Sequence, residues 1–530
     1  MNVKVTRKKQ KFSPDSSRVI ARFLNVNDER SADIIRNVLA LSESEVNASL
    51  MQLLRSYSER HRSVSRIFEK HFAKLAPIFD IMEMNQEDFN PSQKALIGAY
   101  FTMEYSIESA ALFNPSIIES PDQSELQENE KRVIISFRAT GEGHVSSIVF
   151  HSGILDKNNN FIVEPAGKML AEAEVIKRHV YNKESFKQKL LEMQEGSDVI
   201  SPQGEEIKGN LGKDNTISSV ITGKPEKKIK KEKPISPAFI LDKLGDDFTY
   251  GDLMRNLVNE KRNSELTEGQ IKIINQMMWL ASSHYEIVFS IDSGISERVI
   301  FPVSATEQNG IEDARFVKFT DDDGEITYYA TYTAYDGIAI LPKLISTKDF
   351  YTFKILPLNG EIAQNKGMAL FPRKINGKYA MLCRIDGVNN YIAYSDSINM
   401  WHEAKIIQKP KYPWELVQVG NAGSPIETED GWLVITHAVG PMREYTLSAA
   451  LFELDNPEKE IGRLSKPLIS PNEVEREGYV PNVVYSCGSI IHNDSLIIPY
   501  AMSDYASTYA TVNLRELLEV LKKSGELIDS

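Results

Sequence analysis

The chain has 530 residues, of which 42% are hydrophobic and 25% charged, and this is the composition of a folded globular protein with room for more than one structural unit. Its net charge of −13 argues against non-specific binding to nucleic acid or to an anionic membrane, because both need a basic face. The only cysteines are Cys383 and Cys487, and no long apolar run follows the basic first residues. We therefore expect a cytoplasmic protein without a secretory signal or a membrane span.

Residues 1–110 carry the spacing of amphipathic helices. Apolar positions recur from Ile34 to Leu41, and Ser42-Glu-Ser-Glu45 has the form of a capping box, in which each side chain satisfies a free backbone amide of the other residue. The apolar stripe from Val46 to Leu75 is expected to pack against the main domain. A third helix is predicted over 91–112.

Short β-rich runs begin at Arg132 and dominate the chain from Arg298 to Leu514. Turn signals separate them, because Asn-Gly and Asp-rich pairs supply the positive φ angles of tight hairpins. These turns are predicted at 156–160, 321–324, 376–377 and 493–494. Such a meander is typical of a propeller or a sandwich, and the pattern alone does not choose between them.

Residues 165–290 interrupt the β pattern and are interpreted as an insertion. Its predicted helices are 165–200, 237–258 and 268–283. Within it, about 201–234 is polar and rich in Gly and Lys, and a mobile linker explains this segment better than a nucleic-acid patch, since aromatic residues are missing. A short amphipathic helix is predicted over 513–522, packed on the last part of the β region.

Glu312 and Asp313 stand beside Arg315, just before an apolar strand predicted over 328–334. At a sheet edge, one carboxyl group of such a pair can donate a proton while the other binds hydroxyl groups. For this motif alone, an ion pair with Arg315 at the strand end is the more frequent explanation.

Four further polar clusters come at comparable strand ends. They are Asn365-Lys366 with Arg373 and Arg384, then 420–427, then Thr436-His437, and finally 477–482 with Asp504. Each is weak alone, and His437 also fits a satisfied core histidine. Together they favour one site where several strand ends meet, as at the axis of a propeller. The chain lacks the motifs of serine hydrolases, zinc peptidases and P-loop enzymes.

Five segments, taken together, resemble the motifs of glycoside hydrolase family 130, the β-mannoside phosphorylases and β-mannosidases. They are 111–115 with Arg138, 310–315, 366–384, 431–437, and 478–484 with 487–488 and 503–504. The resemblance covers about 110–155 and 295–515. The N-terminal helices and the insertion lie outside the pattern of the shorter members.

The resemblance implies a mainly β chain. Residues 111–164 and 291–515 would form a five-bladed β-propeller, and 516–530 a C-terminal helix and tail. It also implies an inverting cleavage of the β-mannosidic bonds of a mannose-containing oligosaccharide, with no metal and no organic cofactor. In the phosphorylases, inorganic phosphate is the co-substrate and mannose 1-phosphate the product.

The resemblance also implies roles for individual residues. Asp313 matches the general acid, which is thought to act through a sugar hydroxyl. Lys366, Arg384 and His437 are the candidates for binding phosphate, with Arg373 and Arg443 as additions. The residues expected to bind the sugar are Asn114, Arg138, Glu312, Arg315, Asn421, Glu477 and Asp504.

This chain departs from the family at Glu427, where the phosphorylases tend to carry lysine. A carboxylate there would either repel phosphate or activate water, so a β-mannoside hydrolase is the alternative to a phosphorylase. Ala314, in place of the commoner proline, is a milder departure. A glycan-binding propeller without activity and a scaffold for protein partners are further alternatives. The linkage, the glycan length and the existence of a homo-oligomer do not follow from the sequence.

Overall fold

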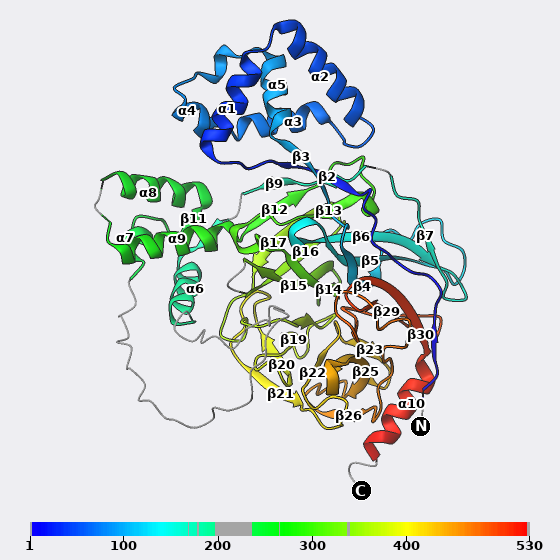
Figure 1. Cartoon of the computed structure of the whole chain (residues 1–530). Helices are drawn as coiled ribbons and strands as arrows, with labels where there is room; N and C mark the ends of the chain where they lie inside the picture. The colour runs from blue at the N-terminus through cyan, green and yellow to red at the C-terminus, as the bar shows by residue number, and fades with distance from the viewer. Residues whose placement is uncertain are drawn as a thin grey trace, which may run out of the picture. The chain divides into compact units, whose positions relative to one another are not determined.

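The computed structural model describes residues 3–167, 169–177, 180–196, 236–263, 266–336 and 340–526. The predicted linker at 201–234 lies outside these ranges. The chain divides into two compact units, one of Met1–Ile176 with Ser283–Ser530 and the other of Lys177–Ser282. Figure 1 shows that the first unit contains the N-terminal helices and most of the strands.

The N-terminal helices pack on one another. They are α1 (Asp28–Leu39), α2 (Glu43–Tyr57), α3 (Val64–Ala73), α4 (Ala76–Ile81) and α5 (Pro91–Tyr100). The predicted capping box is confirmed, because Ser42 Oγ accepts from the Glu45 amide and the Glu45 carboxylate accepts from the Ser42 amide. Val46, Phe72 and Leu96 share a core inside this helical region, so the prediction that the apolar stripe packs against the main domain is wrong.

Helix α5 ends well before the predicted boundary at residue 112. The chain changes there to strand β3 (Thr102–Ser106), which pairs with β2 (Val19–Phe23). Pairing with β2, which is distant in the sequence, therefore decides the conformation of this segment. The helical spacing of its apolar residues does not decide it.

Five sheets of four or more strands hold most of the described strands of the first unit. The first has β4 (Ala111–Glu119), β5 (Lys131–Thr140), β6 (Ser146–Leu155), β7 (Phe161–Val163), β8 (Ala171–Glu172) and β13 (Arg298–Ile300). The second has β9 (Glu174–Ile176), β12 (Tyr285–Val288), β14 (Ile311–Thr320), β15 (Ile326–Tyr335), β16 (Ile340–Thr347) and β17 (Thr352–Pro357). The third has β18 (Ala369–Leu370), β19 (Tyr379–Cys383), β20 (Asn390–Ser395) and β21 (Ala404–Gln408).

The fourth sheet has β22 (Gln418–Asn421), β23 (Ile426–Thr428), β24 (Gly431–Val439), β25 (Tyr445–Phe452) and β26 (Glu460–Arg463). The fifth has β1 (Val5–Arg7), β27 (Val484–Tyr485), β28 (Ile490–His492), β29 (Ser495–Met502) and β30 (Ala506–Asn513). Neighbouring strands are antiparallel except β8 and β13. The predicted turns at 156–160, 321–324 and 493–494 each join two consecutive strands, which confirms these three hairpin signals.

Each sheet contacts the next one along the chain. Strand β4 contacts β14, β14 contacts β18, β19 contacts β22, and β25 contacts β27. Strand β29 of the fifth sheet contacts β4 of the first. Strand β1 pairs with β30, so that residues from near both ends of the chain share one sheet. Helix α10 (Leu514–Glu526) contacts β25 and β26 as well as β30, and thus covers parts of two sheets.

The second unit has its own apolar core. Its elements are β10 (Val180–Asn182), α6 (Lys183–Gly196), α7 (Ala238–Leu241), β11 (Asp247–Thr249), α8 (Tyr250–Asn263) and α9 (Glu268–Ser282). Tyr181 stacks on Phe248 and contacts Phe186 within this core. The prediction of helix over 165–200 is wrong for its first part, where strands β8 to β10 form by pairing with distant segments.

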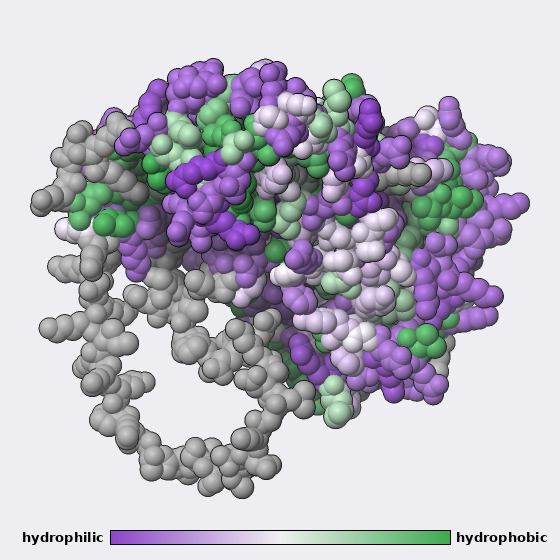
Figure 2. Space-filling model, turned by 45° about the horizontal axis from the view of Figure 1, so that its top comes forward, coloured by the Kyte–Doolittle hydropathy of each residue, from purple (hydrophilic) through white to green (hydrophobic). Residues whose placement is uncertain are grey.

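The molecular face in Figure 2 is mostly hydrophilic, and its apolar residues lie in separate groups. Scattered apolar residues are normal on a protein surface. Among the described residues, no helix has both the length and the apolar character needed to cross a bilayer.

Candidate active site

Strands β4 and β14 carry bulges that shape the centre of the site. Pairing of β4 with β5 shifts register between Phe113 and Ser116, and pairing of β14 with β15 shifts between Glu312 and Arg315. Asn114 and Asp313, the first residues inside the two bulges, have φ angles of +50° and +55°. Asn and Asp enter this left-handed region more readily than other non-glycine residues. The bulges bring their side chains together, and Asn114 Nδ2 donates to Asp313 Oδ1 over 2.6 Å.

Cations surround the two adjacent carboxylates. Glu312 accepts hydrogen bonds from Arg138 Nη2 at 2.7 Å and from Lys366 Nζ at 2.8 Å. Arg138 Nη1 also lies 3.7 Å from Asp313 Oδ1. Burial by itself would raise the pKa of Asp313, but the positive charges of Arg138 and Arg315 outweigh it and hold that pKa below its ordinary value. In the free protein, Asp313 is therefore ionised at neutral pH.

Asp504 completes the acidic side of the site from the turn between β29 and β30. Burial, followed by the negative charge of Asp313, raises the pKa of Asp504 to about 6. Ser503 and Asp504 both have positive φ angles, +51° and +52°. The site thus contains two carboxyl groups whose proton affinities differ, as is common where one site must both hold a proton and bind through a charge.

Arg384 and His437 form the opposite, basic side. His437 Nδ1 lies 2.8 Å from the Asn421 carbonyl, and its Nε2 lies 3.2 Å from Arg384 Nη1. A carbonyl oxygen only accepts, so we assign the proton to Nδ1 and leave Nε2 as the acceptor for Arg384. Burial, then the charges of Arg384 and Arg315, keep the pKa of His437 well below its ordinary value. The neutral imidazole therefore orients the guanidinium of Arg384.

Glycine at position 420 permits this arrangement. A Cβ atom there would lie 2.9 Å from His437 Cε1 and 3.4 Å from Arg384 Cδ. A larger residue at position 420 would press on the imidazole that orients Arg384.

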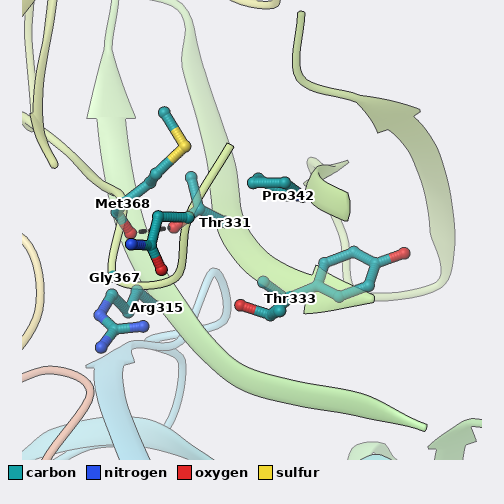
Figure 3. Close-up of a pocket in the computed structure, with 8 residues that line it drawn as sticks. Arg315, Thr331, Thr333, Pro342, Gly367 and Met368 are labelled. Carbon is teal, nitrogen blue, oxygen red and sulfur yellow. Dashed lines mark hydrogen bonds between the residues drawn. The ribbon is translucent and has the colours of Figure 1, made fainter. Parts of the chain in front are cut away.

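Arg315 and the segment carrying Lys366 meet beside these groups. Arg315 Nη2 donates to Tyr485 Oη over 2.7 Å, and Asn421 Nδ2 donates to the Gly367 carbonyl over 2.6 Å. Figure 3 shows a pocket here, with Arg315 close to Gly367 and with Thr331 Oγ1 hydrogen-bonded to the Met368 carbonyl. The hydrogen bonds fix the backbone on which Lys366 is presented.

Three of the arginines have a buried donor left over. The Nε atoms of Arg138, Arg315 and Arg384 are buried and have no hydrogen-bond partner among the described residues. Because the protein itself covers these Nε atoms, an anion or a polar ligand would have to be bound by the Nη groups of the arginines. Within the described ranges, no group of three or more His, Cys, Asp or Glu residues is placed to hold a metal ion.

Comparison with known proteins gives the family of this chain. The model of the family Glyco_hydro_130, described as beta-1,4-mannooligosaccharide phosphorylase, matches residues 257–523, about half of the chain. The chain belongs to glycoside hydrolase family 130.

Two relatives illustrate the similarity at the level of sequence. A 1,2-beta-oligomannan phosphorylase of Thermoanaerobacter is 37% identical over 40% of this chain and 71% of its own length. A beta-1,2-mannobiose phosphorylase of Listeria innocua is 30% identical over 42% of this chain and 63% of its own length. The solved structure of the Listeria innocua beta-1,2-mannobiose phosphorylase with beta-1,2-mannobiose has a TM-score of 0.43 and 20% identity, over 78% of this chain and 92% of that one.

The structure connects most of the site residues inferred from family 130 into one network. Those joined by the contacts and charge interactions described above are Asn114, Arg138, Glu312, Asp313, Arg315, Lys366, Arg384, Asn421, His437 and Asp504. Arg443 is exposed, and its charge acts on Asp504. Glu477 is also exposed, in the segment whose Gly478 packs against Ser503.

The structure does not bring Glu427 and Arg373 into this network. Glu427 lies in β23 opposite Trp432, whereas His437 is five positions farther along β24, about 17 Å away at ~3.3 Å per residue. Both carboxylate oxygens of Glu427 accept from Arg373, each over 2.8 Å, and Arg373 stacks on Trp432. The two residues predicted to affect the nucleophile site instead form an ion pair with each other.

Tyr485 is a site residue that the sequence interpretation missed. Its hydroxyl accepts from Arg315, its ring lies 4.9 Å from the His437 ring, and burial raises its pKa. It stands within an apolar Val-Val-Tyr run that reads as an ordinary strand. Its place between two stretches that resemble family 130, 478–484 and 487–488, was the one signal that pointed to it.

Proposed function

We propose that this chain cleaves β-mannosidic bonds by phosphorolysis and releases mannose 1-phosphate. The observation that carries the proposal is the juxtaposition of the carboxylates Glu312 and Asp313 with the cations Arg315, Lys366 and Arg384. Membership of family 130 supports it, since the relatives that match are named as mannoside phosphorylases.

The proposed architecture is a five-bladed β-propeller in which each large sheet is a blade. The contacts of each sheet with the next, and of the fifth with the first, support a closed ring. The site residues lie on all five sheets or on the segments next to them, as expected where strands approach the axis of such a ring. The pairing of β1 with β30 would then fasten the ring with strands from both ends of the chain.

In this proposal the sugar occupies the acidic side and phosphate the basic side. A phosphate oxygen bonds to the anomeric carbon while the bond from that carbon to the glycosidic oxygen breaks, with inversion. The departing oxygen takes a proton that originates on Asp313 and passes directly or through a sugar hydroxyl. Asp313 must therefore be protonated in the complex. Negative charge on phosphate bound near Lys366 and Arg384 raises the pKa of Asp313 and so favours the protonated form.

Hydrolysis is the competing reaction, and it needs a carboxylate base for water. Glu427, the residue that the sequence offered for this role, is paired with Arg373 at the other end of its sheet. Glu312 is bound by Arg138 and Lys366, which lowers its availability as a base. The pairing of both carboxylates favours phosphate over water as the nucleophile.

A product assay tests the proposal. The protein is incubated with β-1,2- and β-1,4-mannobiose, with and without inorganic phosphate, and mannose 1-phosphate and free mannose are quantified. We expect mannose 1-phosphate, released only when phosphate is present. Free mannose released at the same rate without phosphate would establish the hydrolase instead, and no cleavage of any β-mannoside would leave a glycan-binding protein.

Arg384→Ala sharpens this test. Loss of the guanidinium should raise the KM for phosphate by about 10- to 100-fold, the effect of removing a charge-assisted contact to an anion. Arg373→Ala is the matched control, because this arginine is paired with Glu427 away from the site. Equal changes in both variants would contradict the assigned phosphate position.

A further inference from the structure

Two hairpin turns with the same backbone conformation stand next to the acidic side of the site. One joins β5 to β6 at 141–145, and the other joins β24 to β25 at 440–444. Gly141 and Gly440 have φ and ψ of −108°, −156° and −112°, −161°. His144 and Arg443 occupy equivalent positions with φ of +60° and +56°. A non-glycine residue enters this left-handed region at a cost in free energy. The presence of His144 and Arg443 there points to a role for the side chains that the turns present.

A third segment, 478–482, is fixed between these turns and Asp504. A Cβ on Gly478 would lie 2.5 Å from the Ser503 carbonyl oxygen, and the Val480 amide donates to the same oxygen over 3.1 Å. At the other end, the Asn482 carbonyl accepts from the Tyr445 amide over 3.0 Å, immediately after the second turn. The backbone of this segment is therefore tied down on both sides.

The side chain between these anchors, Tyr479, is 72% exposed. Its ring centroid lies 5.6 Å from that of the exposed His144, and the two rings are inclined by 33°. An aromatic side chain on a rigid backbone offers a large contact area at a low entropic cost. Nearby are the exposed side chains of Arg443 and Glu477, which supply a donor and an acceptor.

We propose that Tyr479 and His144 form a platform for a further sugar ring of an extended β-mannoside, beyond the two sugars that share the cleaved bond. One face of a pyranose ring is made of C–H groups and packs on an aromatic ring, while its hydroxyl groups meet polar side chains at the edge. The position next to Ser503 and Asp504 puts the platform on the sugar side, away from Lys366 and Arg384. This inference rests on the proposed function and adds that the substrate is an oligosaccharide longer than a disaccharide.

The test compares kcat/KM for a β-mannobiose and for the corresponding mannotriose and mannotetraose. Tyr479→Ala should lower the value for the longer substrates by about 5- to 10-fold, the loss of one aromatic stacking contact. The value for the disaccharide should change less than about twofold. Tyr479→Phe should keep wild-type preference because the ring remains, and His144→Ala should shift it in the same direction as Tyr479→Ala. Tyr100→Ala, at a residue 50% exposed at the end of α5, is the surface control.

Equal losses on short and long substrates, or no loss on any, would overturn the platform. Wild-type cleavage of the disaccharide decides the proposed function separately, so a platform that fails in an active phosphorylase is recognised as such. Calorimetric titration of mannotriose into Asp313→Asn and into Asp313→Asn/Tyr479→Ala gives a second readout. The platform predicts weaker binding to the double variant, and equal affinities would again overturn it.

Discussion

Two buried Glu–Lys pairs lie close together in the sequence and have opposite characters. Glu307 and Lys343 are both fully buried, with 2.6 Å between Oε1 and Nζ. The carboxylate also accepts from the hydroxyls of Tyr285 and Tyr332 and from two backbone amides. Burial would raise the pKa of Glu307, but Lys343 and these donors lower it to about 2. Both carboxylate oxygens of Glu307 therefore accept hydrogen bonds from groups inside the protein.

Glu312 and Lys366 form the second pair, and this one is open. Their charged atoms are 2.8 Å apart, but the Lys366 side chain is 40% exposed and Arg138 shares the carboxylate. A pair closed on all sides contributes to the folded structure, whereas an open pair can exchange a partner for a ligand. The two pairs have the same residue types, but they differ in exposure and in how completely their surroundings satisfy them, and this difference separates a structural ion pair from a functional one.

The largest expected effect is on the closed pair. Lys343→Ala leaves the Glu307 carboxylate buried without its cation, which should lower the free energy of unfolding by about 3–5 kcal/mol. Chemical denaturation measures this loss. Lys366→Ala, the matched change in the open pair, should cost less than about 1 kcal/mol of stability while reducing phosphate-dependent turnover. Similar losses of stability in the two variants would remove the distinction between the pairs.

Asp313→Asn tests the open site through its activity. Removing the proton donor should lower turnover by about 100-fold or more, while the isosteric amide keeps the fold. Initial rates of mannose 1-phosphate release measure the effect, and the denaturation midpoint checks the fold. A folded variant with near-normal turnover would exclude Asp313 as the acid.

Asp504→Asn links the acidic side to stability. The folded-state pKa of about 6 lies above the ordinary value, so Asp504 favours the folded state at low pH and this contribution is lost as pH rises through about 6. The uncharged variant should therefore be about 3 kcal/mol more stable than the wild type at pH 8 and about equal to it at pH 4. Denaturation at the two pH values measures the difference. A variant less stable than the wild type at pH 8 would show that Asp504 makes a favourable pair when ionised.

The smallest effect is expected at Glu427. Glu427→Lys breaks a partly exposed ion pair with Arg373, which should cost no more than about 1 kcal/mol, and the KM for phosphate should stay unchanged. Phosphate-saturation kinetics measure it. A tenfold lower KM would place this position beside the phosphate after all.

Local features of the fold could be predicted from the sequence. The capping box at Ser42 and the turn at 321–324 depend on residues a few positions apart, and both form as predicted. The early end of α5 could not be predicted, because it depends on pairing of β3 with β2. The apolar stripe from Val46 likewise gave no sign of which surface would cover it, since neighbouring helices and a sheet offer the same apolar partner.

The site shows the same limit. Family motifs identified Asp313 and its neighbours, but they did not reveal that Asn421 acts by holding the Gly367 carbonyl or that Tyr485 binds Arg315. Glu427 was considered for the site because it departs from the family motif, and the motif did not reveal that the strands carry Glu427 and His437 to opposite ends of a sheet. Position along a strand, more than residue type, decides membership of the site.

The pairing of β1 with β30 has a consequence for how the molecule is made. Val5 pairs with Val512, so strand β1 must wait for a partner that is synthesised about 500 residues later. Contacts between residues so distant in the sequence are slow to form, because the entropy cost of closing a long loop must be met before the contacts stabilise the chain. Until then, the edge of β30 and the apolar faces beneath it are exposed to other chains. We expect the yield of folded protein to fall when β1 is deleted, with the loss appearing as aggregation during synthesis.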